Sequence, residues 1–145
     1  MGTYLKNGFT AEITPKLIDT IPAGFEGDRA RSTDVYLQHG GGAIGRVATA
    51  ATAFVHRYAR HNLMVIASWA AGTDSAAHIG WARKYWTTLE PLTRGVSVNH
   101  EGDATTPGVN AICPENYGML ATIKQKYDPT NLFRLNPNVQ PIRPA

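Results

Sequence analysis

A short apolar run followed at once by an amphipathic helix constrains the fold of this chain most. The run is Asn-Leu-Met-Val-Ile-Ala-Ser-Trp at 62–69, which favours a strand buried on both faces. The turn Gly-Thr-Asp-Ser at 72–75 then supplies helix-capping side chains. Beyond the turn, apolar residues recur at helical spacing (Ile79, Ala82, Trp86 and Leu89), which predicts a helix over 75–90 that Pro91 ends. The pair indicates helices packed on a sheet.

Weaker signals place the remaining elements. They predict a short helix that begins at Pro15 and ends before Pro22, strands at 35–39 and 96–98, and a helix from Pro114 to Asp128. The stretches before and after the first helix are expected to be loops, with residues 25–34 polar and exposed. The tail after Asp128 is expected to be extended. The fold class is therefore α+β, with a small, mostly antiparallel sheet and helices on one face.

Composition excludes several classes of protein. The chain has 145 residues, 43% of them hydrophobic, which suits one domain with a core. Its net charge of +3 comes from scattered basic residues without the pattern of a nucleic-acid binder. No apolar run reaches the roughly 18 residues of a membrane span and no leader-like start is visible, so the cytoplasm is the expected compartment. The single cysteine, Cys113, excludes an internal disulfide and a cysteine-based zinc site.

A glycine-rich segment imitates a dinucleotide-binding motif. Residues 40–45 read Gly-Gly-Gly-Ala-Ile-Gly after a predicted strand, which formally matches GxGxxG. That motif also needs an acidic residue about 20 positions later for a ribose hydroxyl, and no acidic residue lies between Asp34 and Asp74. We therefore interpret the segment as a structural bend.

Three histidines are the first polar candidates for a site, namely His56, His61 and His100. No Asp or Glu accompanies His56 and His61, so no metal site is predicted. Cys113 lies between Ile112 and Pro114 and is expected to be an inert apolar residue. The aromatic residues Trp69, Trp81, Tyr85 and Trp86 are expected to be core. Spacing alone thus indicates an α+β domain with weak catalytic signals.

Three segments, in order along the chain, resemble the C-terminal part of berberine bridge enzyme-like flavin oxidases. The first reads His-Gly-Gly-Gly-Ala-Ile-Gly-Arg-Val at 39–47 and continues as Thr-Ala-Phe-Val-His-Arg at 52–57. The second is Val-Asn-His at 98–100. The third runs from Tyr117 to Asn138 and contains Lys-Tyr-Asp-Pro-Thr-Asn-Leu-Phe-Arg. The third segment is the most specific, because turn, charge and aromatic positions coincide over its length.

The resemblance implies a partial substrate domain of an FAD-linked oxidase. Residues 1–110 would form a substrate-domain-like α+β region, and residues 111–145 the closing helix and extended tail. The flavin-binding domain and its covalent anchors would come from elsewhere, since His39, His56 and Cys113 do not match those anchors. The implied chemistry is hydride transfer from a small alcohol, amine or sugar to the flavin.

The resemblance also implies roles for particular residues. His100 is expected to act directly in catalysis, near the flavin edge where a donor stabilises the reduced anion. Asn99, Tyr117 and Asn131 join it on the cofactor side, although Asn131 also reads as a turn residue beside the Asp-Pro stop. The strand at 62–69 is expected to face the substrate with Asn62, Met64 and Ile66.

Three hypotheses remain open from the sequence. The chain is a component of a flavin oxidase that needs a flavin-domain partner, a stand-alone flavin-free small-molecule-binding or cyclase-like protein, or a structural module that oligomerises through its sheet edge. The first predicts that the chain alone binds free FAD weakly or not at all, and that it self-associates or needs a partner. None of them involves nucleic acid or a membrane.

Overall fold

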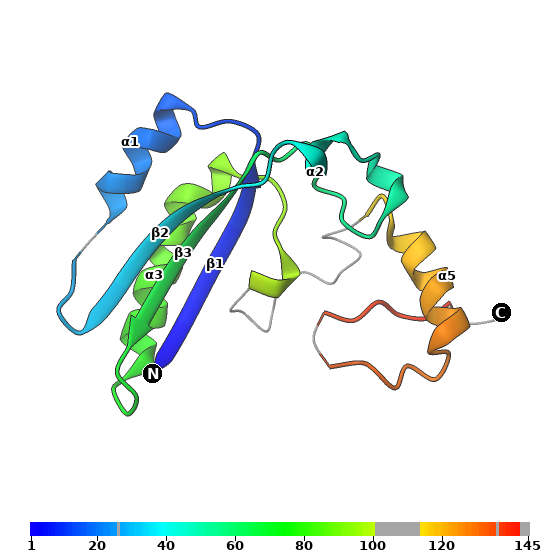
Figure 1. The fold of residues 1–145 in the computed structure, drawn as a ribbon. Helices are drawn as coiled ribbons and strands as arrows, with labels where there is room; N and C mark the ends of the chain where they lie inside the picture. The colour runs from blue at the N-terminus through cyan, green and yellow to red at the C-terminus, as the bar shows by residue number, and fades with distance from the viewer. Residues whose placement is uncertain (26, 101–113, 136, 143–145) are drawn as a thin grey trace.

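A three-stranded antiparallel sheet organises the chain. The computed structural model describes residues 1–25, 27–100, 114–135 and 137–142. Strand β3 (His61–Trp69) lies between β1 (Gly2–Thr10) and β2 (Arg31–His39), and it pairs antiparallel with both. Figure 1 shows β1 and β2 flanking β3 as the two edges of the sheet. The predicted antiparallel α+β architecture is confirmed.

Two capped helices cover one face of this sheet (Figure 1). Helix α1 (Pro15–Gly24) begins after Thr14, whose side-chain oxygen accepts from the Leu17 backbone N–H at 3.2 Å. Helix α3 (Ser75–Leu89) begins after Asp74, whose carboxylate accepts from the Ala76 N–H at 2.9 Å. Both caps satisfy amides that helix starts leave unpaired. The predicted helices are confirmed, although α1 runs two residues past Pro22.

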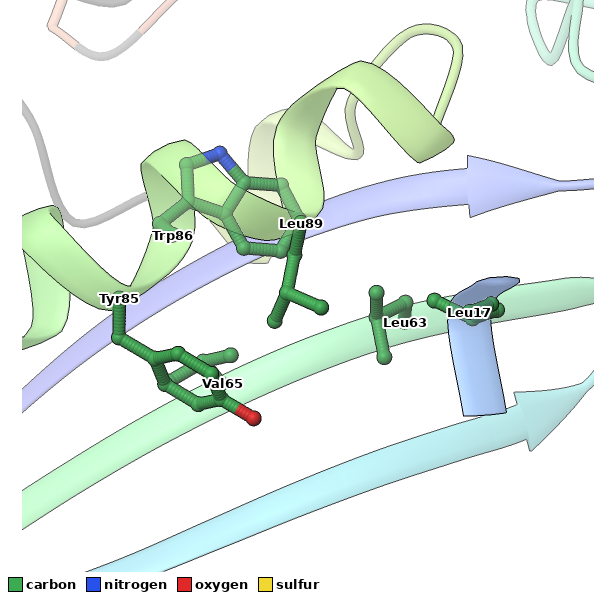
Figure 2. Packing of buried hydrophobic residues seen from close by; sticks show 6 residues of the cluster. All are labelled: Leu17, Leu63, Val65, Tyr85, Trp86 and Leu89. Carbon is green, nitrogen blue, oxygen red and sulfur yellow. The ribbon is translucent and has the colours of Figure 1, made fainter. Parts of the chain in front are cut away.

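The core lies between the sheet and these helices. Leu63 and Val65 on β3 meet a set of side chains from α1 and α3, namely Leu17, Tyr85, Trp86 and Leu89 (Figure 2). A second cluster joins Ala67 and Trp69 to Tyr4 and Ala82. The four predicted core aromatics are therefore buried or packed against the core, as expected. Burial of each large apolar side chain contributes about 1.5–3 kcal/mol.

Among the described residues, no α-helix covers the other face of the sheet. Because side chains alternate along a strand, Met64 and Ile66 project away from Leu63 and Val65, and they are only half-buried. On β2 the corresponding residue Tyr36 is exposed. The prediction that β3 is buried on both faces is therefore wrong, because α1 and α3 pack on one side.

Three local predictions are also wrong. Residues 2–10 were expected to be a loop and form β1, and β2 begins at Arg31, inside the stretch expected to be exposed. Residues 96–98 were expected to be a strand, but Val98–His100 form a short 3-10 turn, η3. The pairing partners of β1 lie about sixty residues away, at 61–69, so no local pattern reveals them.

The glycine-rich segment is a bend, as predicted. Gly42 has a φ of 73°, which only glycine adopts freely, and it leads into the four-residue helix α2 (Ala43–Arg46). The 3-10 turn η1 (Thr49–Ala51) follows, and η2 (Glu90–Leu92) extends α3. None of the helices in the described part of the chain has the length and apolar character of a membrane span.

Helix α5 (Tyr117–Tyr127) and the tail stand beside the sheet layer (Figure 1). The Asn116 amide attaches the start of α5 by donating to the carbonyl oxygens of Thr49 and Thr52, at 2.9 and 2.6 Å. Ala121 is the buried residue of this helix. The predicted boundary near residue 110 and Cys113 lie outside the described residues.

Asp128 holds the turn that ends α5. Its carboxylate accepts from the Lys124 ammonium, from the Leu132 N–H at 2.7 Å and from the Phe133 N–H at 3.1 Å. The Lys124 hydrogen bond, followed by those two amides, lowers the pKa of Asp128 below its ordinary value. These bonds exist when the carboxylate is charged, so they are complete at neutral pH and lost as pH falls through the lowered pKa.

We predict an acid-induced opening of this turn. The amide NMR signals of Leu132 and Phe133 should shift together, at a pH below the ordinary range of aspartate. Lys124→Gln should move the transition to higher pH because the main cause of the lowered pKa is removed. Lys126→Gln is the matched control and should leave the transition in place. Equal transitions in all three proteins would contradict the assigned role of Lys124.

Candidate active site

A pocket with polar and apolar walls opens at the end of the sheet where β2 ends and β3 begins. Its volume is about 230 Å³. Its polar lining side chains are Gln38, His39, His61, Asn62, Ser97 and His100. Phe9, Phe54 and Ile44 contribute apolar walls. The pocket thus gathers residues from β1, β2, β3, the segment around α2, and η3.

Asn7 fixes the η3 segment at the pocket. Its side chain is fully buried, and its Oδ1 accepts from the Ser97 N–H at 2.7 Å. Its Nδ2 donates to the Ser97 carbonyl at 3.1 Å and to the His100 carbonyl. The Asn7 side chain therefore satisfies backbone groups of the η3 segment, as a neighbouring strand would. These bonds position the backbone that carries His100.

His56 is a structural residue rather than part of the pocket. Its ring stacks on Phe9 with centroids 4.5 Å apart, and Phe54 packs edge-on at 5.7 Å from it. Burial lowers the pKa of His56, which favours the neutral ring. The ring also lies close to Gly95, where a Cβ would be 2.4 Å from the His56 Cε1 atom. The histidine thus belongs to an aromatic cluster beneath one pocket wall.

Arg57 ties the segment around α2 to that cluster. Its guanidinium donates to the Ile44 carbonyl at 3.2 Å and to the Thr52 hydroxyl. It also lies over the Phe54 ring, 5.0 Å from the centroid. Ile44 and Phe54 line the pocket, so Arg57 holds two of its walls in place. The sequence Thr-Ala-Phe-Val-His-Arg at 52–57 therefore serves to shape the pocket.

Two histidines on adjacent strands meet at the pocket. His39 on β2 lies directly opposite His61 on β3, and His39 Nδ1 is 3.4 Å from His61 Nε2. Burial lowers the pKa of His61, and the neighbouring His39 and Arg60 lower it further. His61 is therefore neutral at neutral pH and able to accept a proton.

Three buried polar atoms of this pocket have no hydrogen-bond partner among the described residues. They are His61 Nδ1, Asn62 Oδ1 and His100 Nδ1. Buried polar atoms in native proteins are normally paired, so unpaired ones that line one pocket indicate a place for a polar ligand. Within the described ranges, no group of three His, Cys, Asp or Glu residues is arranged to hold a metal ion.

Of the residues predicted to face the substrate or act in catalysis, some line the pocket and others lie outside it. His100 and Asn62 line the pocket, whereas Met64 and Ile66 share the uncovered sheet face farther along β3. Asn99 is exposed, next to His100 in η3.

The two predicted cofactor-side residues outside the sheet layer lie on α5 and the tail. The Tyr117 hydroxyl accepts from the Gln140 N–H at 3.3 Å. Asn131 has a φ of 55°, the left-handed conformation expected of the turn residue that the Asp-Pro context indicates. Neither residue lines the pocket.

Sequence reasoning missed His39, Asn7 and the pairing of His39 with His61. His39 carried only an alternation signal, and its partner is set by the register of two strands 22 residues apart. The usable signal was the position of each histidine at a strand end, which becomes informative only once the antiparallel pairing is known.

Comparison with known proteins supports the resemblance read from the sequence. The family described as "Berberine and berberine like" matches residues 114–140. The uncharacterised FAD-linked oxidoreductase YgaK of Bacillus subtilis (strain 168) is 29% identical over 131 residues, which are 90% of this chain and 29% of the relative. An FAD-linked oxidoreductase of Dictyostelium discoideum is 24% identical over 98% of this chain and 30% of its own length.

The chain is similar to part of a berberine bridge enzyme-like FAD-linked oxidoreductase. Solved structures share its fold. Aclacinomycin oxidoreductase superimposes with a TM-score of 0.81 at 21% sequence identity, over 97% of this chain and 32% of its own length. A carbohydrate oxidase from Microdochium nivale superimposes with a TM-score of 0.79 at 18% sequence identity, over 97% of this chain and 33% of its own length. The chain therefore spans about a third of these berberine bridge enzyme-like proteins. The predicted C-terminal berberine bridge enzyme-like resemblance is confirmed.

The pocket formed by the described residues is too small to hold a whole flavin. A pocket of about 230 Å³ is smaller than the roughly 300–1,000 Å³ of typical cofactor and drug-sized sites. Its unpaired nitrogen and oxygen atoms are suited to the polar edge of a ring or to a hydroxyl-bearing substrate. The glycine-rich bend leads into a helix of only four residues, so it offers no phosphate-binding helix start.

Proposed function

We propose that this chain forms the substrate side of an FAD-dependent oxidase that acts on a small alcohol, amine or sugar, and that a flavin-binding domain completes the site. When bound, the flavin would supply the hydride acceptor for oxidation of the substrate carbon, with dioxygen as the final electron acceptor. The pocket residues of this chain bind and orient the substrate. The uncovered sheet face, with Met64 and Ile66, would lie toward the flavin domain.

One observation carries the proposal. The segment that matches the berberine family leaves most of its large apolar side chains uncovered: Met119, Ile123, Tyr127, Leu132, Phe133 and Leu135 are all exposed. Phe133 is 77% and Leu135 is 87% exposed. Exposed apolar residues concentrated along one helix and tail indicate a surface that another protein part covers.

Substrate class is supported by the chemistry of the pocket. Histidine, asparagine and glutamine side chains hydrogen-bond to hydroxyl and amine groups, and Phe9 and Phe54 offer apolar contact to a ring. Charged carboxylates are absent from the described lining of this pocket, so a neutral substrate fits it best. The similar solved proteins include a carbohydrate oxidase and an oxidoreductase of aclacinomycin.

The test is assembly with a flavin-domain polypeptide from the same source. The chain alone should bind FAD weakly or not at all in a fluorescence titration, whereas the co-expressed pair should co-purify with visible flavin absorbance. Phe133→Ser combined with Leu135→Ser should lower the yield of the flavin-containing pair at least tenfold, because the covered apolar surface is lost.

Ile18→Ser is the matched control, because Ile18 is 55% exposed but lies on α1, away from the tail. It should leave assembly unchanged. Tight, stoichiometric FAD binding by the isolated chain, or a tail variant that assembles as well as the control, would refute the proposed partner surface.

A further inference from the structure

The proposed oxidation needs a group that takes a proton from the substrate, and histidines are the candidates among the described residues of the pocket. Among the described lining residues, His39, His61 and His100 carry imidazole rings, which can accept a proton on a ring nitrogen. No Asp, Glu, Lys, Cys or Tyr side chain joins them in that described lining. The choice of base is therefore a choice among three rings.

His61 is the ring best placed to accept a proton. Its Nδ1 is buried and unpaired among the described residues, while its Nε2 faces His39 Nδ1 at 3.4 Å. A neutral imidazole has one N–H and one lone pair. When the N–H of His61 is on Nε2 and points to His39, the free lone pair is on Nδ1, a buried atom of a residue that lines the pocket.

We propose that His61 and His39 form a proton relay from the pocket to solvent. This inference rests on the proposed function and names the base of that reaction. His61 Nδ1 takes the proton of the substrate hydroxyl or amine, and His61 Nε2–H passes its proton to His39 Nδ1. The exposed His39 ring then releases a proton from Nε2 to water.

The step is balanced in atoms and electrons. For an alcohol, the O–H bond breaks and its proton forms a new N–H bond on His61. The C–H bond breaks with its electron pair, which leaves as hydride to the oxidised flavin of the partner domain, and a C=O bond forms. The substrate is oxidised by two electrons and the flavin is reduced by two.

The surroundings of His61 favour its neutral, proton-accepting form. His39 on β2 and Arg60 immediately before β3 are the charged or titratable groups that lower its pKa. On the β1 side it pairs with Thr10, which carries no charge, and His100 shares the pocket from η3. Among the described residues, His100 has no second histidine at hydrogen-bond distance. It therefore lacks a neighbouring ring to which it could pass a proton, as His61 can to His39.

The first experiment uses the chain alone and needs no flavin. The pH titration of the His61 ring is followed by NMR in the wild-type chain, in His39→Gln, and in His78→Gln. His39→Gln should move the His61 titration to higher pH, because a positive neighbour that lowers its pKa is gone. His78→Gln should leave it in place, since His78 stacks on Trp69 outside the pocket. An unmoved His61 titration in His39→Gln would overturn the coupling.

The second experiment uses the assembled flavin-containing pair. His61→Gln should lower the rate of flavin reduction by about 10²–10⁴-fold while the bound flavin keeps its absorbance spectrum. In the wild-type pair the rate should fall as pH drops through the pKa of His61, and His39→Gln should move this limb to higher pH. Because His39 is exposed, this variant folds even if His61→Gln does not.

The outcomes separate the two claims. Normal flavin reduction by a spectrally intact His61→Gln pair overturns the relay and leaves the oxidase function standing. A wild-type pair that binds flavin but oxidises no alcohol, amine or sugar overturns both.

Discussion

Gly95→Ala is expected to lower the free energy of unfolding by roughly 2–5 kcal/mol. Gly95 has a φ of 70°, in the left-handed region that alanine adopts only with strain. A Cβ there would lie 2.4 Å from the His56 Cε1 atom. The His56 ring cannot move aside easily, because Phe9 stacks against it and the residue is only 7% exposed.

The backbone around Gly95 cannot shift easily either. The Phe9 N–H donates to the Gly95 carbonyl at 3.2 Å, and the Arg94 N–H donates to the Phe9 carbonyl at 2.7 Å. These bonds attach the segment after η2 to the outer edge of β1. Relief of the clash would therefore break pairing at the sheet edge, so the cost of the alanine is not avoided by a small movement.

Gly72→Ala is the matched control for Gly95→Ala in urea unfolding. Gly72 has a φ of 87°, but a Cβ at that position meets nothing within 4 Å. Its substitution should cost only the backbone strain, about 1 kcal/mol. Adding His56→Ala to Gly95→Ala should recover part of the loss, since it removes the clashing ring. Equal losses at Gly72 and Gly95 would show that the contact with His56 is unimportant.

Local signals predicted the elements whose stability is decided locally. Thr14 and Asp74 both cap helices as their residue types indicate, because a cap needs only the next two or three amides. The helix over 75–90 was predicted from the spacing of its apolar residues, which is also a local signal. The central strand was predicted from its apolar run, since β3 supplies residues to both core clusters.

The remaining elements depend on distant partners. Strand β1 contains two glycines and an asparagine, which weaken any local strand pattern, and it forms because β3 pairs with it along its whole length. Residues 96–98 carry β-branched valines, yet the segment turns because the Asn7 side chain binds its backbone. Tertiary contact overrides propensity in both places.

The site was predictable only in part, because some of its residues are brought together by contacts between distant segments of the chain. His100 and Asn62 were identified through the resemblance, and both line the pocket. The pairing of His39 with His61 follows from strand register, which the sequence does not reveal without the fold. His56 was a candidate because of its chemistry, and its stacked, buried ring shows that it supports a wall instead.

Asn7→Ala is expected to lower the free energy of unfolding by roughly 3 kcal/mol, because three backbone groups in and just before η3 lose their hydrogen bonds to the Asn7 side chain. The Ser97 N–H loses its acceptor, and the Ser97 and His100 carbonyls lose a donor. Asn7 is 0% exposed, so water does not readily replace these bonds. Asn99→Ala, in the same turn but exposed, is the matched control and should change stability by less than about 0.5 kcal/mol.

Asn7→Asp separates hydrogen bonding from packing at the same position. A carboxylate still accepts from the Ser97 N–H, but it repels the Ser97 and His100 carbonyl oxygens that now accept from the amide. Protonation supplies a donor again, so the folded state should raise the pKa of the new aspartate. Stability of this variant should therefore increase as pH falls through that pKa, relative to the wild-type chain.

The position of His100 gives the functional readout of the same change. Since Asn7 holds η3 against β1, its loss should free the His100 ring from the pocket and make the NMR chemical shifts of that ring resemble those of an exposed histidine. His61, which β3 holds by strand pairing, should keep its own titration in Asn7→Ala. Identical chemical shifts of the His100 ring in Asn7→Ala and the wild-type chain would mean that η3 keeps its place without Asn7.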